Sequence, residues 1–161
     1  MSIEVAEKGT EISHMVGFIV GREEFGVDIM KVREIIRMME ITRIPTAPEF
    51  MEGIISLRGT VIPVIDFKKL FWGWDEGDGR EGDRRIIVVV IRDKTIGLIV
   101  DKVTHVVKLA AGRISPPPEL FKNDSQDYIG GIGQFEDKML IILNADELVG
   151  KDELTAFDQA A

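Results

Sequence analysis

The stretch that decides the fold is Phe50–Phe67, FMEGIISLRGTVIPVIDF. Two short apolar runs typical of β-strands, Ile54–Leu57 and Val61–Ile65, flank a single Arg-Gly pair. Arg58 is the only cation of the stretch, and a guanidinium is almost never fully buried without a partner. Gly59 beside it favours a tight turn. The sequence therefore predicts a hairpin that presents Arg58, whose planar fork can grip a carboxylate through two parallel hydrogen bonds.

The composition narrows the class of protein. The 161 residues suit one domain, or two small barrels that share a core, and 45% of them are hydrophobic. The net charge of −8 argues against nucleic acid as a partner, because such binding needs clustered Lys and Arg. The absence of cysteine excludes disulfides, zinc thiolate sites and thiol nucleophiles. No signal peptide or membrane-spanning run is visible, so we expect a cytoplasmic protein without membrane insertion.

The order of apolar runs predicts an all-β protein. About nine or ten short β runs alternate with turns and short helical pieces, which is typical of small barrels or a sandwich. We expect one domain over residues 14–150, with a flexible tail over 1–13 and a C-terminal tail over 151–161. The Gly- and charge-rich segment 73–84 is expected to be a flexible acidic loop. No internal sequence repeat is clear.

Three turns are predicted from local residues. A single helical turn near Met30–Val32 is expected to lead into a strand that ends at Met38. A second helical turn is expected over Glu49–Met51. Asp93–Lys94 is expected to form a hairpin turn between two apolar runs.

Three polar or imino residues are expected at strand ends or edges. Pro63 lacks an amide hydrogen and fits an edge strand or a bulge better than a central strand. Asp66 is expected to cap a short helix that ends at Phe71. Asn144 is expected to cap a final short helix, with Glu147 in the capping-box position.

The chain shows no catalytic constellation. His105 alternates with apolar residues on a strand, which is typical of a partly buried structural histidine. Ser56 and Ser115 lie in no G-x-S-x-G elbow. The glycines of segment 130–133 precede no helix, so bulges or tight corners explain them better than a phosphate site. We therefore assign no catalytic residue, no cofactor and no metal.

Six motifs stand in a recognisable order and spacing between about Met15 and Val149. The strongest is Gly53–Gly59 running into Ile62–Asp66. The others are Phe25–Ile29, Val32–Ile36, Ile44–Pro45, Ala47–Pro48 and Gly97–Val103. Together they resemble the CheW-like coupling proteins of bacterial chemotaxis.

The resemblance implies a fold and a function. The fold is two SH3-like, five-stranded β-barrel subdomains that share a hydrophobic core, with short helical pieces. The function is that of a non-enzymatic adaptor, which bridges the cytoplasmic tips of chemoreceptors to the regulatory domain of the histidine kinase CheA in membrane-associated arrays. The family's receptor-contact positions correspond to Val32, Glu34 and Arg58; kinase contacts are not assigned. A coupling protein of a twitching or other non-flagellar chemosensory pathway is the alternative.

Two interpretations of Glu34 and Arg58 stay open. The pair either contacts a receptor helix, or forms an internal salt bridge that orders the hairpin. Two other classes of protein are less well supported. A small-ligand or enzymatic barrel needs converging titratable groups, and a nucleic-acid-binding barrel needs a basic, aromatic face; the sequence offers neither.

Overall fold

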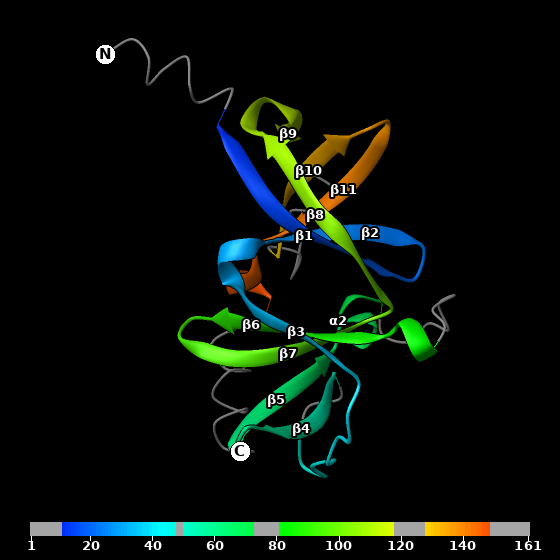
Figure 1. Cartoon of the computed structure of the whole chain (residues 1–161), viewed down its shortest axis with the longest axis vertical. Coiled ribbons are helices and arrows are strands. Elements are labelled where there is room, and N and C mark those ends of the chain that lie inside the picture. The colour runs from blue at the N-terminus through cyan, green and yellow to red at the C-terminus, as the bar shows by residue number, and fades with distance from the viewer. Residues whose placement is uncertain (1–10, 48–49, 73–80, 118–127, 149–161) are drawn as a thin grey trace.

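The computed structural model describes residues 11–47, 50–72, 81–117 and 128–148 (Figure 1). Its strands form two sheets, and each sheet curls around a small core of its own. One sheet comes from the middle of the chain and is called the central barrel. The other is assembled from both ends of the chain and is called the terminal barrel. The prediction of an all-β fold with two barrel subdomains is confirmed.

The central barrel has five strands in the spatial order β3-β6-β7-β5-β4. Neighbouring strands are antiparallel, except that β5 and β7 are parallel. A bridge between Thr42 and Ile54 joins the segment after β3 to β4. The elements from its entry onward are η1 (Ile29–Lys31), β3 (Val32–Arg37), β4 (Met51–Leu57), β5 (Thr60–Asp66), α2 (Phe67–Trp72), η2 (Glu81–Asp83), β6 (Arg85–Ile91) and β7 (Lys94–Val100).

The terminal barrel has the spatial order β8-β1-β2-β11-β10-β9, in which β9 adds a two-residue strand to the five that were predicted. Here the parallel neighbours are β2 and β11. The first hairpin of the chain is therefore inserted beside the last one. The elements are β1 (Ile12–Val20), β2 (Glu23–Asp28), β8 (Lys102–Ala110), η3 (Ala111–Arg113), β9 (Ile114–Ser115), β10 (Ile129–Phe135), β11 (Lys138–Leu143) and η5 (Ala145–Glu147).

The two barrels repeat one strand arrangement. Reading β3-β6-β7-β5-β4 against β8-β1-β2-β11-β10 places the parallel pair at the same point of each sheet. The register agrees residue by residue: Gly53 lies opposite Val64 just after a bulge, and Gly131 lies opposite Ile142 just after a bulge. Because the terminal barrel takes its strands from both chain ends, the repeat is permuted in sequence. That permutation hides it from a search along the chain.

A large core is shared between the barrels. Three fully buried rings meet there: Phe18 and Phe25 of the terminal barrel, and Phe67 of α2. The Phe18 centroid lies 5.7 Å from that of Phe25 and 5.6 Å from that of Phe67, and the latter two are 5.0 Å apart. Such offset and edge-to-face contacts stabilise a junction beyond the area that they bury. The predicted common hydrophobic core is thus the main link between the barrels.

Several local predictions are confirmed. The helical turn at the entry to the central barrel is η1, and it leads directly into β3. Asp66 caps α2, because its Oδ1 accepts a hydrogen bond of 3.0 Å from the Lys68 amide. The helix ends at Trp72, one residue later than predicted. Gly131 follows a bulge, as expected for a glycine within a strand.

The prediction for Pro63 is wrong, because β5 is a central strand. Pro63 pairs with Ile54 of β4 on one side. On the other side, the parallel pairing with β7 begins one residue later, at Val64. The missing amide therefore lies ahead of that ladder, and a proline is tolerated in a central strand.

Three further predictions are wrong in detail. The β6–β7 turn is centred on Arg92 and Asp93, whose φ angles are 49° and 68°, one residue earlier than predicted. Asn144 precedes η5 but makes no side-chain capping bond; its backbone carbonyl accepts from the amide of Glu147 instead. His105 is exposed rather than partly buried, and its ring centroid lies 5.7 Å from that of Phe135.

The described residues bear on only a few of the predicted segment boundaries. Strand β1 begins at Ile12, two residues before the expected start of the domain. Met51, expected in a helical turn, begins β4, while residues 48–49 lie outside the described residues. Residues 73–80 of the predicted loop also lie outside them, and Glu81–Asp83 form the 3-10 helix η2. The limits of the two tails stay predictions.

Candidate functional site

The β4–β5 turn lifts Arg58 out of the apolar layer, as the sequence predicted. Leu57 pairs with Thr60, so the turn contains only Arg58 and Gly59. Their φ angles are 50° and 82°, as in the two-residue turns whose twist matches that of hairpin strands. The Arg58 side chain is 72% exposed. The β4–β5 hairpin thus carries an exposed guanidinium at its tip.

Glu34 of β3 holds that guanidinium in a bidentate ion pair. Arg58 Nη1 donates to Glu34 Oε2 over 2.6 Å, and Nη2 donates to Oε1 over 2.7 Å. A bulge precedes Glu34, which lies opposite Val88 of β6. The salt bridge that the sequence left open is therefore present, and it ties the edge strand β3 to the tip of the β4–β5 hairpin.

The ion pair shifts both titrations in the direction that keeps it charged. The hydrogen bonds from Arg58 hold the pKa of the Glu34 carboxyl below its usual range, although partial burial opposes them. The charges of Arg58 and Arg33 lower that pKa further. In return, the hydrogen bonds and charge of Glu34 raise the pKa of the Arg58 guanidinium. The site presents a fixed, permanently ionised pair at neutral pH.

Val32 lies apart from the pair. It is half-buried, pairs with Val89 of β6 and packs against the shared core at the junction of the barrels. The inward side of β3 therefore runs from the junction at Val32 to the ion pair at Glu34. The structure brings Glu34 and Arg58 together, and places Val32 two residues away on the same strand.

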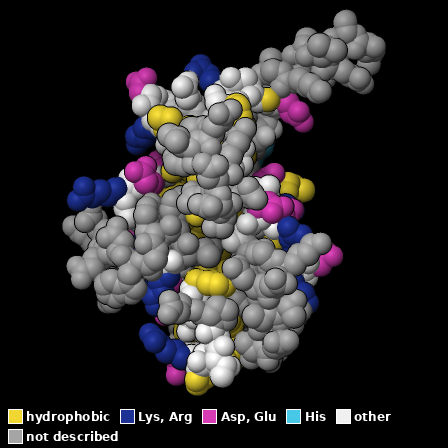
Figure 2. Space-filling view, turned by 180° about the vertical axis from the view of Figure 1, so that it is seen from behind, with side chains coloured by type: hydrophobic (Ala, Val, Ile, Leu, Met, Phe, Trp, Pro, Cys, Tyr) yellow, Lys and Arg dark blue, Asp and Glu magenta, His cyan; other side chains and the backbone are white. Residues whose placement is uncertain are grey.

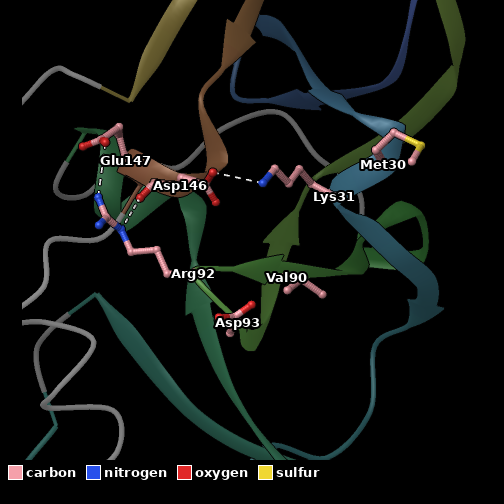
Figure 3. A pocket seen from close by; sticks show the side chains of 7 residues that line it. All are labelled: Met30, Lys31, Val90, Arg92, Asp93, Asp146 and Glu147. Carbon is pink, nitrogen blue, oxygen red and sulfur yellow. Dashed lines mark hydrogen bonds and ion pairs between the residues drawn. The ribbon is translucent and has the colours of Figure 1, made fainter.

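A second charged group lies at the junction, around a pocket of about 530 Å³ (Figure 3). Lys31 of η1 donates to Asp146 Oδ2 over 2.9 Å. Arg92 of the β6–β7 turn donates through Nε to the backbone carbonyl of Asp146 over 2.9 Å, and through Nη2 to Glu147 over 3.2 Å. Met30, Val90 and Asp93 complete the lining. Sequence reasoning missed this group, because three distant segments supply it with no motif of their own.

The structure adds two observations on the class of site. Among the described residues, no group of His, Cys, Asp or Glu is arranged to hold a metal, and no helix is long and apolar enough to cross a membrane. On the face seen in Figure 2, Lys and Arg side chains are interspersed with Asp and Glu side chains. That mixture differs from the basic stripe that a nucleic-acid backbone requires.

Comparison with known proteins decides the family. The model of the CheW-like domain matches residues 14–153. The chain belongs to the CheW-like family. This CheW-like chain is 33% identical to the chemotaxis protein CheW of Klebsiella aerogenes over 144 residues, which cover 89% of this chain and 86% of that protein. It is 32% identical over 102 residues to Protein FrzA of Myxococcus xanthus, covering 63% and 62% of the two chains.

A solved structure supports the same assignment. The crystal structure of scaffolding protein TtCheW from Thermoanaerobacter tengcongensis superposes with a TM-score of 0.79 at 40% identity, covering 88% of this CheW-like chain and 94% of that one. The resemblance and the fold expected from the sequence are therefore confirmed. The family assignment makes the chain a chemotaxis coupling adaptor.

Proposed function

We propose that this chain couples the cytoplasmic tips of chemoreceptors to the histidine kinase CheA, without enzymatic activity of its own. Val32, Glu34 and Arg58 form the receptor contact in this proposal. The observation that carries it is the bidentate Arg58–Glu34 pair at an exposed hairpin tip. The kinase-binding residues are not assigned.

The geometry is compatible with both interpretations of the pair. A guanidinium carries five N–H donors, and Glu34 accepts from two of them. The remaining donors belong to a side chain that is mostly exposed, so Arg58 can be held by Glu34 and still bind a carboxylate on a partner. Because Glu34 fixes the rotamer in advance, binding orders less side chain than a mobile Arg would require.

Val32 supplies the apolar part of the proposed contact. It is half-buried between the two barrels, so a helix laid along β3 would meet an apolar junction at one end and the ion pair at the other. Ile35, which follows Glu34 in the sequence, and Val61, three residues after Arg58, expose further apolar surface. An amphipathic helix with a carboxylate is the partner that such a surface fits.

The test is to replace Arg58 by Ala and measure receptor binding and receptor-dependent kinase stimulation in the reconstituted system. We expect affinity for a receptor cytoplasmic fragment to fall by about tenfold or more, as when one partner of an interfacial charge pair is truncated. The melting temperature should not change, because exposed ion pairs contribute little to stability. Arg43→Ala is the matched control: Arg43 is an exposed Arg of the same region, 3.7 Å from Glu52.

Two outcomes would contradict this proposal. Undiminished kinase stimulation by Arg58→Ala would exclude a role in coupling. Loss of the fold in that variant would show that the ion pair is structural, whereas loss of binding alone supports contact.

The pathway is a separate question. We propose that the chain acts in the cytoplasm and is recruited to receptor arrays at the membrane. The alternative, a twitching or other non-flagellar chemosensory pathway, is compatible with the similarity to Protein FrzA. Co-purification with each CheA-type kinase of the source organism separates the two, because the regulatory domain that binds identifies the pathway.

A further inference from the structure

The segment that brings the chain into the central barrel is poorly anchored by packing. This segment, η1, contains no buried residue, and its Met30 is 86% exposed. Within η1, the Met30 amide bonds to Asp28, which belongs to the same stretch of chain. Immediately after η1 comes Val32, the apolar residue of the proposed receptor contact. What fixes η1 therefore adds to the β6 pairing and the core contact that hold Val32 at the start of β3.

Lys31 connects η1 to η5, the last element among the described residues. Its Nζ lies 2.9 Å from Asp146 Oδ2 in η5, across the junction of the barrels (Figure 3). Arg92 of the central barrel holds the same short helix from the other side, through the Asp146 carbonyl and the Glu147 carboxylate. The hydrogen bond from Lys31 holds the pKa of the Asp146 carboxyl below its usual range, so Asp146 is charged at neutral pH. Four charged side chains thus join three segments.

The internal repeat supplies an independent observation. In the strand correspondence, α2 follows β5 as η5 follows β11, and the chain after β7 corresponds to η1 after β2. At that equivalent place Lys68 of α2 lies 3.2 Å from Asp101, which also accepts a 2.7 Å hydrogen bond from the Gly21 amide. The same bridge is therefore built twice across the junction, with the charges of the two partners reversed.

The two bridges differ in their exposure. Lys68 and Asp101 are 17% and 7% exposed, whereas Lys31 and Asp146 are 41% and 38% exposed. A buried pair is shielded from salt, and an exposed pair is screened by it. The Lys68–Asp101 bridge is thus a permanent part of the junction, and the Lys31 bridge is the one that solution conditions can loosen.

We infer that Lys31, Arg92, Asp146 and Glu147 form an ionic latch that holds η1 against the terminal barrel and so positions the start of β3 for the receptor contact. This inference rests on the proposed function. The latch residues are positioning residues, because they act on Val32 through η1. They also link the receptor-contact strand to the last described element of the chain.

The direct test is amide hydrogen exchange in the full chain. Asp146→Asn keeps the shape of the side chain and removes its charge. We expect exchange at Met30 to Val32 to become faster by about tenfold, since local opening reports local stability. Exchange at the β4–β5 turn should not change. Glu52→Gln is the matched control, because Glu52 pairs with Arg43 and Lys69 inside the central barrel.

A binding assay tests the positioning role. Affinity of Asp146→Asn for a receptor cytoplasmic fragment should fall by roughly threefold to tenfold, the size of coupling seen through packed networks. The deficit relative to the unmodified chain should shrink in high salt, where the latch is already weakened. The double variant Lys31→Asp, Asp146→Lys restores the pair with reversed charge, as the other bridge has it, and should recover both exchange protection and binding.

The outcomes separate the two proposals. Unchanged exchange at η1 in Asp146→Asn overturns the latch, whatever receptor binding does. Faster exchange with unchanged affinity overturns the positioning role. If instead Arg58→Ala binds the receptor as well as the unmodified chain does, the proposed function fails while the exchange experiment still tests the latch.

Discussion

The β4–β5 and β10–β11 hairpins occupy equivalent places in the two barrels, yet their tips are opposite in charge. Both turns have two central residues with positive φ: Arg58 and Gly59 at 50° and 82°, Glu136 and Asp137 at 45° and 61°. The central barrel thus presents a cation, and the terminal barrel presents two carboxylates. The repeated backbone fixes where the tip lies and leaves its chemistry open.

The neighbouring strand shows the same contrast. In the central barrel, Glu34 of β3 reaches the hairpin through an ion pair. At the corresponding bulge of the terminal barrel, His105 of β8 lies against the ring of Phe135. The same arrangement of strands therefore accommodates either an ion pair, as in the central barrel, or a contact between two rings, as in the terminal barrel. The surface chemistry of each barrel therefore depends on a few turn and edge residues. Matched mutations at these residues are expected to have different effects in the two barrels.

The largest expected difference between the barrels concerns their bulge glycines. Gly53 has φ of 152°, and a Cβ there would lie 2.2 Å from the Thr42 carbonyl oxygen. Gly53→Ala should therefore lower the free energy of unfolding by about 3 kcal/mol, combining backbone strain with a clash against backbone. Urea denaturation followed by circular dichroism measures it.

Gly131→Ala is the matched substitution in the terminal barrel. Its Cβ would lie 2.9 Å from the carbonyl oxygen of Ser115, in the two-residue strand β9, which can shift more easily than the segment at Thr42. We expect a loss of about 1–2 kcal/mol. Equal losses at the two glycines would show that the repeat is energetically symmetric, contrary to this expectation.

The next effect is on binding. The double variant Arg58→Glu, Glu34→Arg exchanges the two charges of the Arg58–Glu34 pair and keeps an ion pair. If Arg58 binds a receptor carboxylate directly, the exchange should not restore receptor affinity, which stays lower by about tenfold or more. Isothermal titration with a receptor fragment measures this. Full recovery of binding would mean that the pair only orders the hairpin.

A smaller gain in stability is expected at the acidic tip. Neither Glu136 nor Asp137 suits positive φ as well as Asn and Gly do. Glu136→Asn with Asp137→Gly should therefore raise the free energy of unfolding by roughly 1 kcal/mol. The same measurement on Arg58→Asn, at the already glycine-containing tip, should show a smaller gain. A loss of stability at the acidic tip would indicate that its carboxylates make stabilising contacts.

The smallest effect is the pH dependence of the Arg58–Glu34 ion pair. Because the pKa of Glu34 is lowered in the folded state, the ion pair is intact at neutral pH and is lost only as the pH falls through that lowered value. Receptor affinity should stay constant from neutral to mildly acidic pH and then decline. A carboxyl NMR titration of Glu34, with Arg58→Ala as the reference, locates the transition. A Glu34 titration that is unaffected by Arg58→Ala would contradict the claim that Arg58 lowers the pKa of Glu34.

The sequence was most predictive where local chemistry determines structure. Alternating apolar residues and glycines located the strands, and an Arg-Gly pair between two strands located the exposed tip. Asp66 could be assigned as a cap because the bond spans two residues. The Glu34–Arg58 pair was foreseen only as one of two possibilities, since nothing along the chain measures the distance between them.

Other features depend on contacts between distant segments. Pro63 was predicted at an edge or a bulge from its missing amide alone. A central position is tolerated because the pairing with β7 begins only at Val64. The exposure of His105 depends on which side of β8 faces the core after a bulge. The latch joins residues 115 apart in sequence, and no spacing rule predicts such a meeting.

The permuted strand order has a consequence for synthesis on the ribosome. The strands of the central barrel are consecutive in sequence, so all of them have been synthesised once β7 is complete. Strands β1 and β2 precede it in the chain, but β11, the parallel partner of β2, is complete only at Leu143. At about 5–20 residues per second, the first hairpin waits on the order of ten seconds with Phe18 and Phe25 lacking their final surroundings. We expect the nascent β1–β2 hairpin to need chaperone protection until it can pack against Phe67 of the completed central barrel.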